Sequence, residues 1–127
     1  MKKIFIDSTA IKVQSEQCVF CNLLTVTAGT NCPQGGDAGH GGKTYLALNN
    51  DGGTCMDAVI KTWEGESFQI DQIEKIELIF GGDCECETLI EALEFAVAVL
   101  KGQSPATARR IIQKHADWKG HEQHGTA

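Results

Sequence analysis

The sequence predicts an α+β protein in which a mostly antiparallel sheet packs against two C-terminal helices. Short apolar and β-branched runs, separated by turn residues, fill the first two-thirds of the chain, and apolar residues recur at helical spacing from about residue 85 onward. With 127 residues, 42% of them hydrophobic and 22% charged, the chain has the size and composition of a soluble globular domain. We therefore expect a single α+β domain over residues 1–118 and a flexible polar tail over residues 119–127.

Several segments in the first two-thirds have the composition of short strands. The clearest is an alternating run that ends at Phe80, immediately before the turn residues Gly81 and Gly82. Turn chemistry at Asn50–Gly53 predicts that the strands on either side of it form a hairpin. The expected strands are 3–6, 10–14, 19–27, 45–48, 56–62, 67–70 and 73–80.

Two helices are predicted to close the chain. The first, from about Glu85 to Lys101, has acids in its first turn, where the helix dipole favours them, and an apolar stripe that we expect to be buried against the sheet. The second begins with Ser104 as its N-cap and Pro105 in the first helical position, and it runs to about Trp118. The stripe of the first helix consists of Leu89, Leu93, Ala96, Val97 and Leu100.

The most informative segment runs from Gly29 to Thr44 and reads GTNCPQGGDAGHGGKT. Its six glycines tolerate positive φ and allow a backbone to approach a ligand closely. Successive exposed N–H groups can form a cradle for an anion, although such a segment can also be a simple mobile surface loop. The segment is not a P-loop, because the spacing before Gly42-Lys43-Thr44 is wrong and a strand, not a helix, is expected after it.

We therefore predict that this segment binds a phosphorylated small molecule. Lys43 supplies a positive charge for a phosphate, and His40, Tyr45 or Trp63 could stack on a base or hydrogen-bond to it. His40 has two other interpretations: a hydrogen bond that braces the loop, or a general base oriented by Asp37. The predicted ligand-binding residues are Gly35, Gly36, Asp37, Gly39, His40, Gly41, Gly42, Lys43, Thr44, Tyr45 and Arg109.

Other side chains that could carry chemistry have more ordinary interpretations. Arg109 and Arg110 point about 100° apart on a helix, so at most one faces a given pocket, and a solvated helix face is the alternative for both. The six cysteines include the pairs Cys18–Cys21 and Cys84–Cys86, but we expect free thiols rather than a thiolate metal site. We assign no catalytic residue, no metal ligand and no cofactor.

Charge and hydropathy exclude several classes of partner. A net charge of −6 argues against nonspecific binding to nucleic acid. The N-terminal residues lack the long apolar run of a signal peptide, and no stretch is long enough to span a membrane. We expect a cytoplasmic homo-oligomer that binds a small anionic ligand, such as a cyclic nucleotide, and has no nucleic-acid or membrane partner.

The block from Gly29 to Leu46, followed by Gly52-Gly53-Thr54, resembles the glycine block of a family of small proteins of phages and prophages. The segment from Ile76 to Leu100 is similar too, so the resemblance covers about half of the chain. The block labels the family but names no activity. The resemblance implies an accessory protein in the host cytoplasm, and some such proteins counter host immunity by sequestering cyclic or ADP-ribose-type signal nucleotides.

Three functions of different classes are compatible with these observations. The first is a non-enzymatic module that captures a signal nucleotide, which would be an anti-defence activity. The second is a metal-assisted enzyme that cleaves such a nucleotide with Asp37 and His40, and the third is a structural or interaction domain. Because the chain has no paired-carboxylate or His-Asp motif, the sequence favours the binding module over the enzyme.

Overall fold

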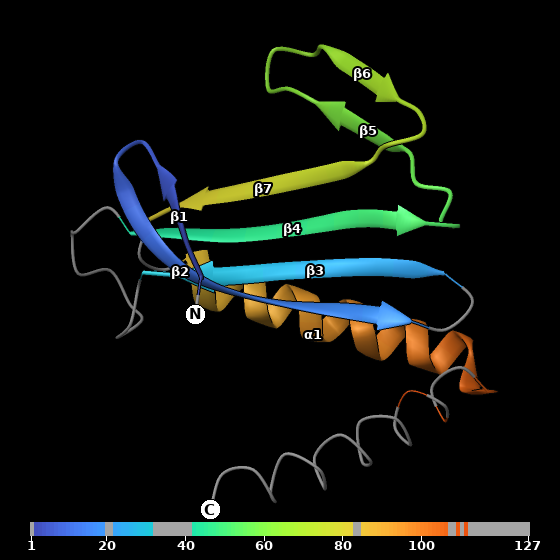
Figure 1. The fold of residues 1–127 in the computed structure, drawn as a ribbon. Coiled ribbons are helices and arrows are strands. Elements are labelled where there is room, and N and C mark those ends of the chain that lie inside the picture. Colours follow the sequence, from blue (N-terminus) through green and yellow to red (C-terminus); the bar gives the residue numbers. More distant parts are fainter. Residues whose placement is uncertain are drawn as a thin grey trace, which may run out of the picture. The chain divides into compact units, whose positions relative to one another are not determined.

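The computed structural model describes residues 2–19, 22–31, 42–82 and 85–106, together with Arg109 and Ile111. Contacts divide the chain into two compact units, Met1–Glu87 and Thr88–Ala127, and each is described by itself. The described residues of the first unit form a sheet and a separate hairpin, and those of the second belong mainly to a long helix (Figure 1). The architecture is α+β, as the sequence predicts. The predicted tail at 119–127 lies outside the described residues.

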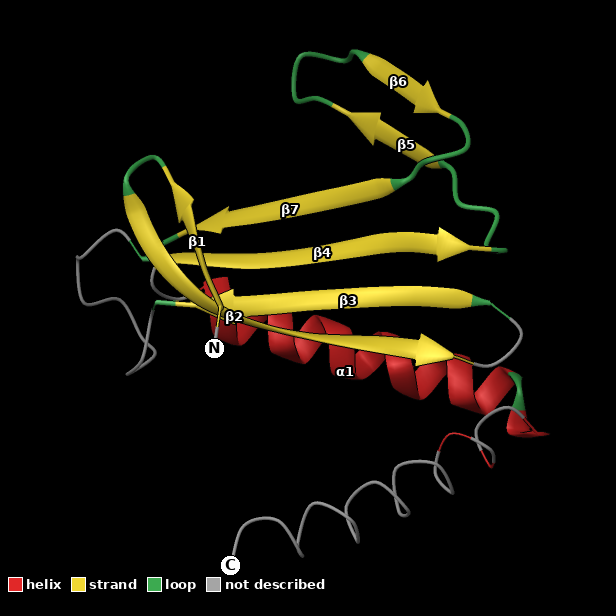
Figure 2. Cartoon of the chain, in the orientation of Figure 1, coloured by secondary structure: helices red, strands yellow, loops and turns green. Residues whose placement is uncertain are grey.

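A five-stranded antiparallel sheet dominates the first unit, with the strand order β1-β2-β3-β4-β7 (Figure 2). Neighbours in the sheet follow one another along the chain, except that the hairpin β5–β6 is inserted between β4 and β7. The strands are β1 (Lys2–Ile6), β2 (Thr9–Val19), β3 (Leu23–Thr30), β4 (Lys43–Gly52), β5 (Ala58–Lys61), β6 (Ser67–Ile70) and β7 (Lys75–Gly81).

The predicted hairpin over Asn50–Gly53 is wrong. Strand β4 continues to Gly52 and pairs with β3 and β7, whereas β5 pairs with β6. The turn-forming Asn50 is used differently: its backbone N–H donates to the Glu74 carbonyl (2.6 Å), and its side chain donates to the Thr54 carbonyl. The composition of residues 50–53 indicated a change of direction correctly, but it could not indicate which strand β4 pairs with.

The single strand predicted at 19–27 is divided between two strands. Strand β2 ends at Val19 and β3 begins at Leu23, and these two residues are paired in the sheet. The region contains one turn-favouring residue, Asn22, and no glycine or proline, so the turn signal in the sequence is weak. The predicted strand 10–14 is correspondingly the first half of a much longer β2.

The hydrophobic core lies on one face of the sheet. Its fully buried members, Ile11 and Val13, alternate along β2, and Tyr45 and Ala47 alternate along β4. Ile4 and Ile6 of β1 pack against this cluster. Between the two pairs, Gly29 of β3 is in register with both Val13 and Tyr45.

The first predicted helix is confirmed as α1 (Glu85–Gln103), with Glu85 and Glu87 in its first turn. The predicted burial of its apolar stripe is wrong, because the helix has no buried side chain and Leu93 is 41% exposed. Helical spacing shows which face of a helix is apolar, but not what covers that face. Most of the second predicted helix, 104–118, lies outside the described residues. Within the described part of the chain, no helix combines the length and hydropathy that crossing a membrane requires.

Candidate functional site

The described residues include only part of the predicted ligand site. Gly42, Lys43, Thr44 and Tyr45 lie at the start of β4, and Arg109 lies in the second unit. The other predicted ligand-binding residues fall outside the described residues: Gly35, Gly36, Asp37, Gly39, His40 and Gly41.

Both ends of the glycine-rich segment are hydrogen-bonded to each other. The Asn31 N–H donates to the Lys43 carbonyl (3.2 Å), and the Lys43 N–H donates to Asn31 Oδ1 (2.7 Å). The carbonyl of Gly42, a buried residue, accepts from the Gly82 N–H (2.7 Å), which ties the same point to the end of β7. We call this set of bonds the Asn31–Lys43 clip. It fixes the separation of the two ends of the segment 32–41.

Lys43 remains a candidate cation for a ligand. Its side chain is half-buried, and its backbone groups are used in the clip. Strand alternation places Lys43 on the same sheet face as Tyr45 and Ala47, and Thr44 on the opposite face. The structure therefore separates the predicted site residues Lys43 and Thr44 by the thickness of the sheet.

The side chain of Thr44 is used within the fold. It is buried, and its Oγ1 is hydrogen-bonded to Thr30 Oγ1 (2.9 Å). Thr30 Oγ1 also donates to the Lys43 carbonyl (3.2 Å). This pair of hydroxyl groups supports the clip from the other face of the sheet.

Tyr45 belongs to the core. The residue is buried, and its hydroxyl donates to Glu77 Oε2 (2.6 Å). Burial, followed by the hydrogen bond to Glu77 and its negative charge, raises the pKa of Tyr45 from 10.0 to about 12. Little of the ring is accessible, so stacking of a base on Tyr45 would require the core to open.

The other two predicted contact residues lie apart from the clip along the chain. Arg109 is exposed and belongs to the second unit. Trp63 lies in the turn between β5 and β6, where its side chain is fully exposed.

A polar network on the sheet was missed by sequence reasoning. The carboxylate of Asp51 accepts from Gln17 Nε2 (3.0 Å), Thr25 Oγ1 and Asn49 Nδ2 (2.6 Å). These hydrogen bonds, that of Gln17 first, hold the pKa of Asp51 below its ordinary value. Polar residues at alternate positions of three neighbouring strands are the signal that could have revealed this network.

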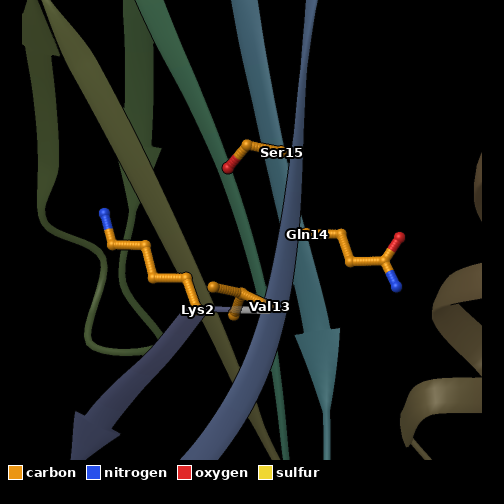
Figure 3. A pocket seen from close by; sticks show the side chains of 4 residues that line it. All are labelled: Lys2, Val13, Gln14 and Ser15. Carbon is orange, nitrogen blue, oxygen red and sulfur yellow. The ribbon is translucent and has the colours of Figure 1, made fainter.

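An open cavity of about 510 Å³, which was not predicted, lies beside the start of β1. Lys2, Val13, Gln14 and Ser15 line it. Figure 3 shows Lys2, Val13 and Ser15 on one side of β2 and Gln14 on the other. The lining thus includes the Lys2 ammonium group and the Ser15 hydroxyl, and Ser15 Oγ is hydrogen-bonded to Thr27 Oγ1 (2.6 Å).

In the part of the chain that the structure describes, no three side chains of His, Cys, Asp or Glu lie close enough together to hold a metal ion. Cys18, Cys55 and Cys86 are free thiols. Cys21, Cys32 and Cys84 lie outside the described residues, as do all four histidines.

Comparison with known proteins found no family model, no curated protein and no solved structure that matches the chain.

Proposed function

We propose that this protein binds a phosphorylated small molecule at the glycine-rich segment and releases it unchanged. The observation that carries the proposal is the Asn31–Lys43 clip. The clip holds both ends of a segment rich in glycine N–H groups together, and the lysine is part of the clip itself. A binding loop with fixed ends loses less conformational entropy when it closes on a ligand than a free loop does.

In this proposal each group has a defined role. The Lys43 ammonium neutralises a phosphate as a mobile point charge, and glycine N–H groups between residues 35 and 42 donate to its oxygens. His40 contacts the remainder of the ligand. The buried Thr44 and Tyr45 support the strand on which Lys43 lies, which is a positioning role rather than direct contact.

The resemblance to small phage and prophage proteins suggests which phosphorylated molecule is bound. We assign the ligand to the signal nucleotides, either cyclic or of the ADP-ribose type, and the activity to sequestration in the host cytoplasm. An accessory protein of this kind needs affinity but no turnover, which agrees with the assignment of no catalytic residue.

Calorimetric titration with cyclic dinucleotides, cyclic trinucleotides and ADP-ribose isomers tests the proposal. One charge-assisted contact contributes about 1.5–3 kcal/mol, so Lys43→Ala should weaken binding roughly ten- to a hundredfold. Lys61→Ala removes the same charge from an exposed position on β5 and should bind like wild type.

Two results would contradict the proposal. If none of these ligands binds and Lys43→Ala only lowers the melting temperature, the glycine-rich segment is structural. If the bound ligand is recovered in cleaved form after the protein is digested with protease, the protein is an enzyme.

A further inference from the structure

The hairpin β5–β6 presents an apolar face that the rest of its unit does not cover. Its register pairs Ile60 with Phe68 and Ala58 with Ile70, so all four side chains share one face. Ile60, Phe68 and Ile70 are each between 44% and 49% exposed. A two-stranded hairpin is at best marginally stable alone in water, and apolar burial against a partner would stabilise it.

The tip of the hairpin holds a tryptophan in an ordered turn. The Thr62 N–H donates to the Glu66 carbonyl (2.9 Å), the Gly65 N–H to the Thr62 carbonyl (3.1 Å), and the Glu66 N–H to Thr62 Oγ1 (3.2 Å). Gly65 has a φ of +92°, which glycine adopts readily. Trp63 is fully exposed in this turn, and Glu64 and Glu66 follow it along the chain. Exposed tryptophan on a rigid support is the side-chain type that dominates the energy of protein interfaces.

Strands β1 and β2 carry an exposed patch of lysines and apolar residues that is complementary to the acidic, aromatic hairpin. Lys3 is in register with Lys12, and Phe5 with Ala10, so the four exposed residues share one sheet face. Phe5 is 72% exposed. Like charges directly opposite one another destabilise a strand pair. Carboxylates of another molecule placed beside Lys3 and Lys12 would reduce the repulsion between the two ammonium groups.

We propose that the β5–β6 hairpin of one copy docks on the Lys3–Phe5–Lys12 patch of a second copy. The charges are complementary: residues 57–74 carry five acids and one lysine, whereas residues 2–14 carry three lysines and one acid. The apolar groups match as well, because Trp63 and Phe68 would lie against Phe5. Aromatic side chains bury about 150–250 Å² each, which brings this contact towards the roughly 800 Å² per partner of a standard interface.

The contact is head to tail. Strand β1 forms one edge of the sheet, and β7, to which the hairpin is connected, forms the other. Each copy therefore offers a hairpin to one neighbour and a patch to another, and the assembly closes into a ring if the rotation between copies allows it. This inference concerns assembly and is independent of the ligand proposed above.

Charge-reversal variants analysed by light scattering and native mass spectrometry test the inference. Wild type should form oligomers that weaken as the salt concentration rises. The tip variant Glu64→Lys/Glu66→Lys and the patch variant Lys3→Glu/Lys12→Glu should each be monomeric. An equimolar mixture of the two should assemble again, because each variant tip then meets a patch of opposite charge.

Two further variants complete the experiment. Trp63→Ala should raise the dissociation constant of the assembly by about 30-fold or more. Glu16→Lys/Glu91→Lys makes the same charge change at exposed positions outside both surfaces, and it should assemble like wild type. Circular dichroism establishes that every variant is folded. A monomeric wild type, a tip or patch variant that keeps the mass of wild type, or a mixture that stays monomeric would each overturn the inference.

Discussion

At Gly29, strand β3 passes so close to β2 that any side chain would collide. A Cβ there would meet the Lys12 carbonyl oxygen and the Val13 side chain. We expect Gly29→Ala to destabilise the fold by about 1–3 kcal/mol through overpacking. Urea denaturation measures this, and Gly81→Ala is the matched control, because a Cβ on Gly81 would enter open space. Equal stability of the two variants would show that β2 and β3 can separate without cost.

Tyr45 is the only tyrosine of the chain, so its ionisation can be followed by absorbance. Because its pKa rises from 10.0 to about 12 on folding, the neutral phenol is favoured in the folded state. Its contribution to stability is complete below pH 10 and is lost as the pH rises towards 12. The tyrosinate absorbance of native protein should therefore appear well above pH 10, and that of denatured protein near pH 10.

One substitution separates the two causes of the raised Tyr45 pKa, which are burial and the neighbouring Glu77. Glu77→Gln removes the negative charge beside the phenol but leaves Tyr45 in the core. We expect the Tyr45 pKa in this variant to lie between the denatured and the wild-type values, because burial is the larger cause. An unchanged pKa would mean that Glu77 has no influence, contrary to the 2.6 Å hydrogen bond.

Among the elements, the positions of strands and helix α1 follow from local sequence, whereas the pairing does not. Alternation predicted β7, and helical spacing predicted α1 within two residues at its C-terminal end. The partner of β4 depends on contacts between residues distant in sequence. Local turn chemistry favoured β5 as the partner of β4. Strand β4 pairs with β7 instead, because that pairing extends over most of β4 and continues the five-stranded sheet.

The candidate site was only partly predictable for the same reason. The glycine content located the segment and Lys43 at its end. A strand at Tyr45 was predicted correctly, but the position of Tyr45 in the core depends on its packing with Ile11 and Val13, on a strand more than 30 residues earlier. The role of Asn31 was also missed, because a side chain that pairs with a distant backbone has no local signature.

The Asn31–Lys43 clip can be tested by removing the side chain of Asn31. Asn31→Ala leaves the partly buried Lys43 N–H without its acceptor, which should cost about 1–3 kcal/mol of stability. It should also weaken ligand binding, because the ends of the segment are then held less firmly. Asn49→Ala removes an exposed side-chain hydrogen bond at the other end of β4 and should have a smaller effect in urea denaturation. If Asn31→Ala loses stability but binds ligand like wild type, the clip does not organise the binding segment.

At the scale of the whole molecule, charge is unevenly distributed along an acidic chain. The net charge of −6 opposes an anionic ligand, so a phosphate site must rely on local donors such as Lys43 and glycine N–H groups. The lysines of β1 and β2 lie at one edge of the five-stranded sheet, whereas the acids of the β5–β6 hairpin belong to a separate two-stranded sheet connected to β7 at the other edge. This separation of charge is the basis of the proposed contact between copies. The proposed phosphate site thus depends on a few local groups, whereas the proposed contact between copies depends on a charge difference between distant parts of the first unit.

All six cysteines belong to the first unit, Met1–Glu87, and their chemical state tests the expected reducing environment. Titration of protein denatured with a chelator and without reductant should find six reactive thiols per chain. In native protein the exposed Cys18 and Cys55 should react first, and the half-buried Cys86 more slowly. Elemental analysis of the native protein should find little zinc. Fewer than six reactive thiols would indicate disulfides. Stoichiometric zinc would instead indicate a thiolate site formed by the Cys18–Cys21 and Cys84–Cys86 pairs, because four thiolates from two such pairs complete a tetrahedral shell.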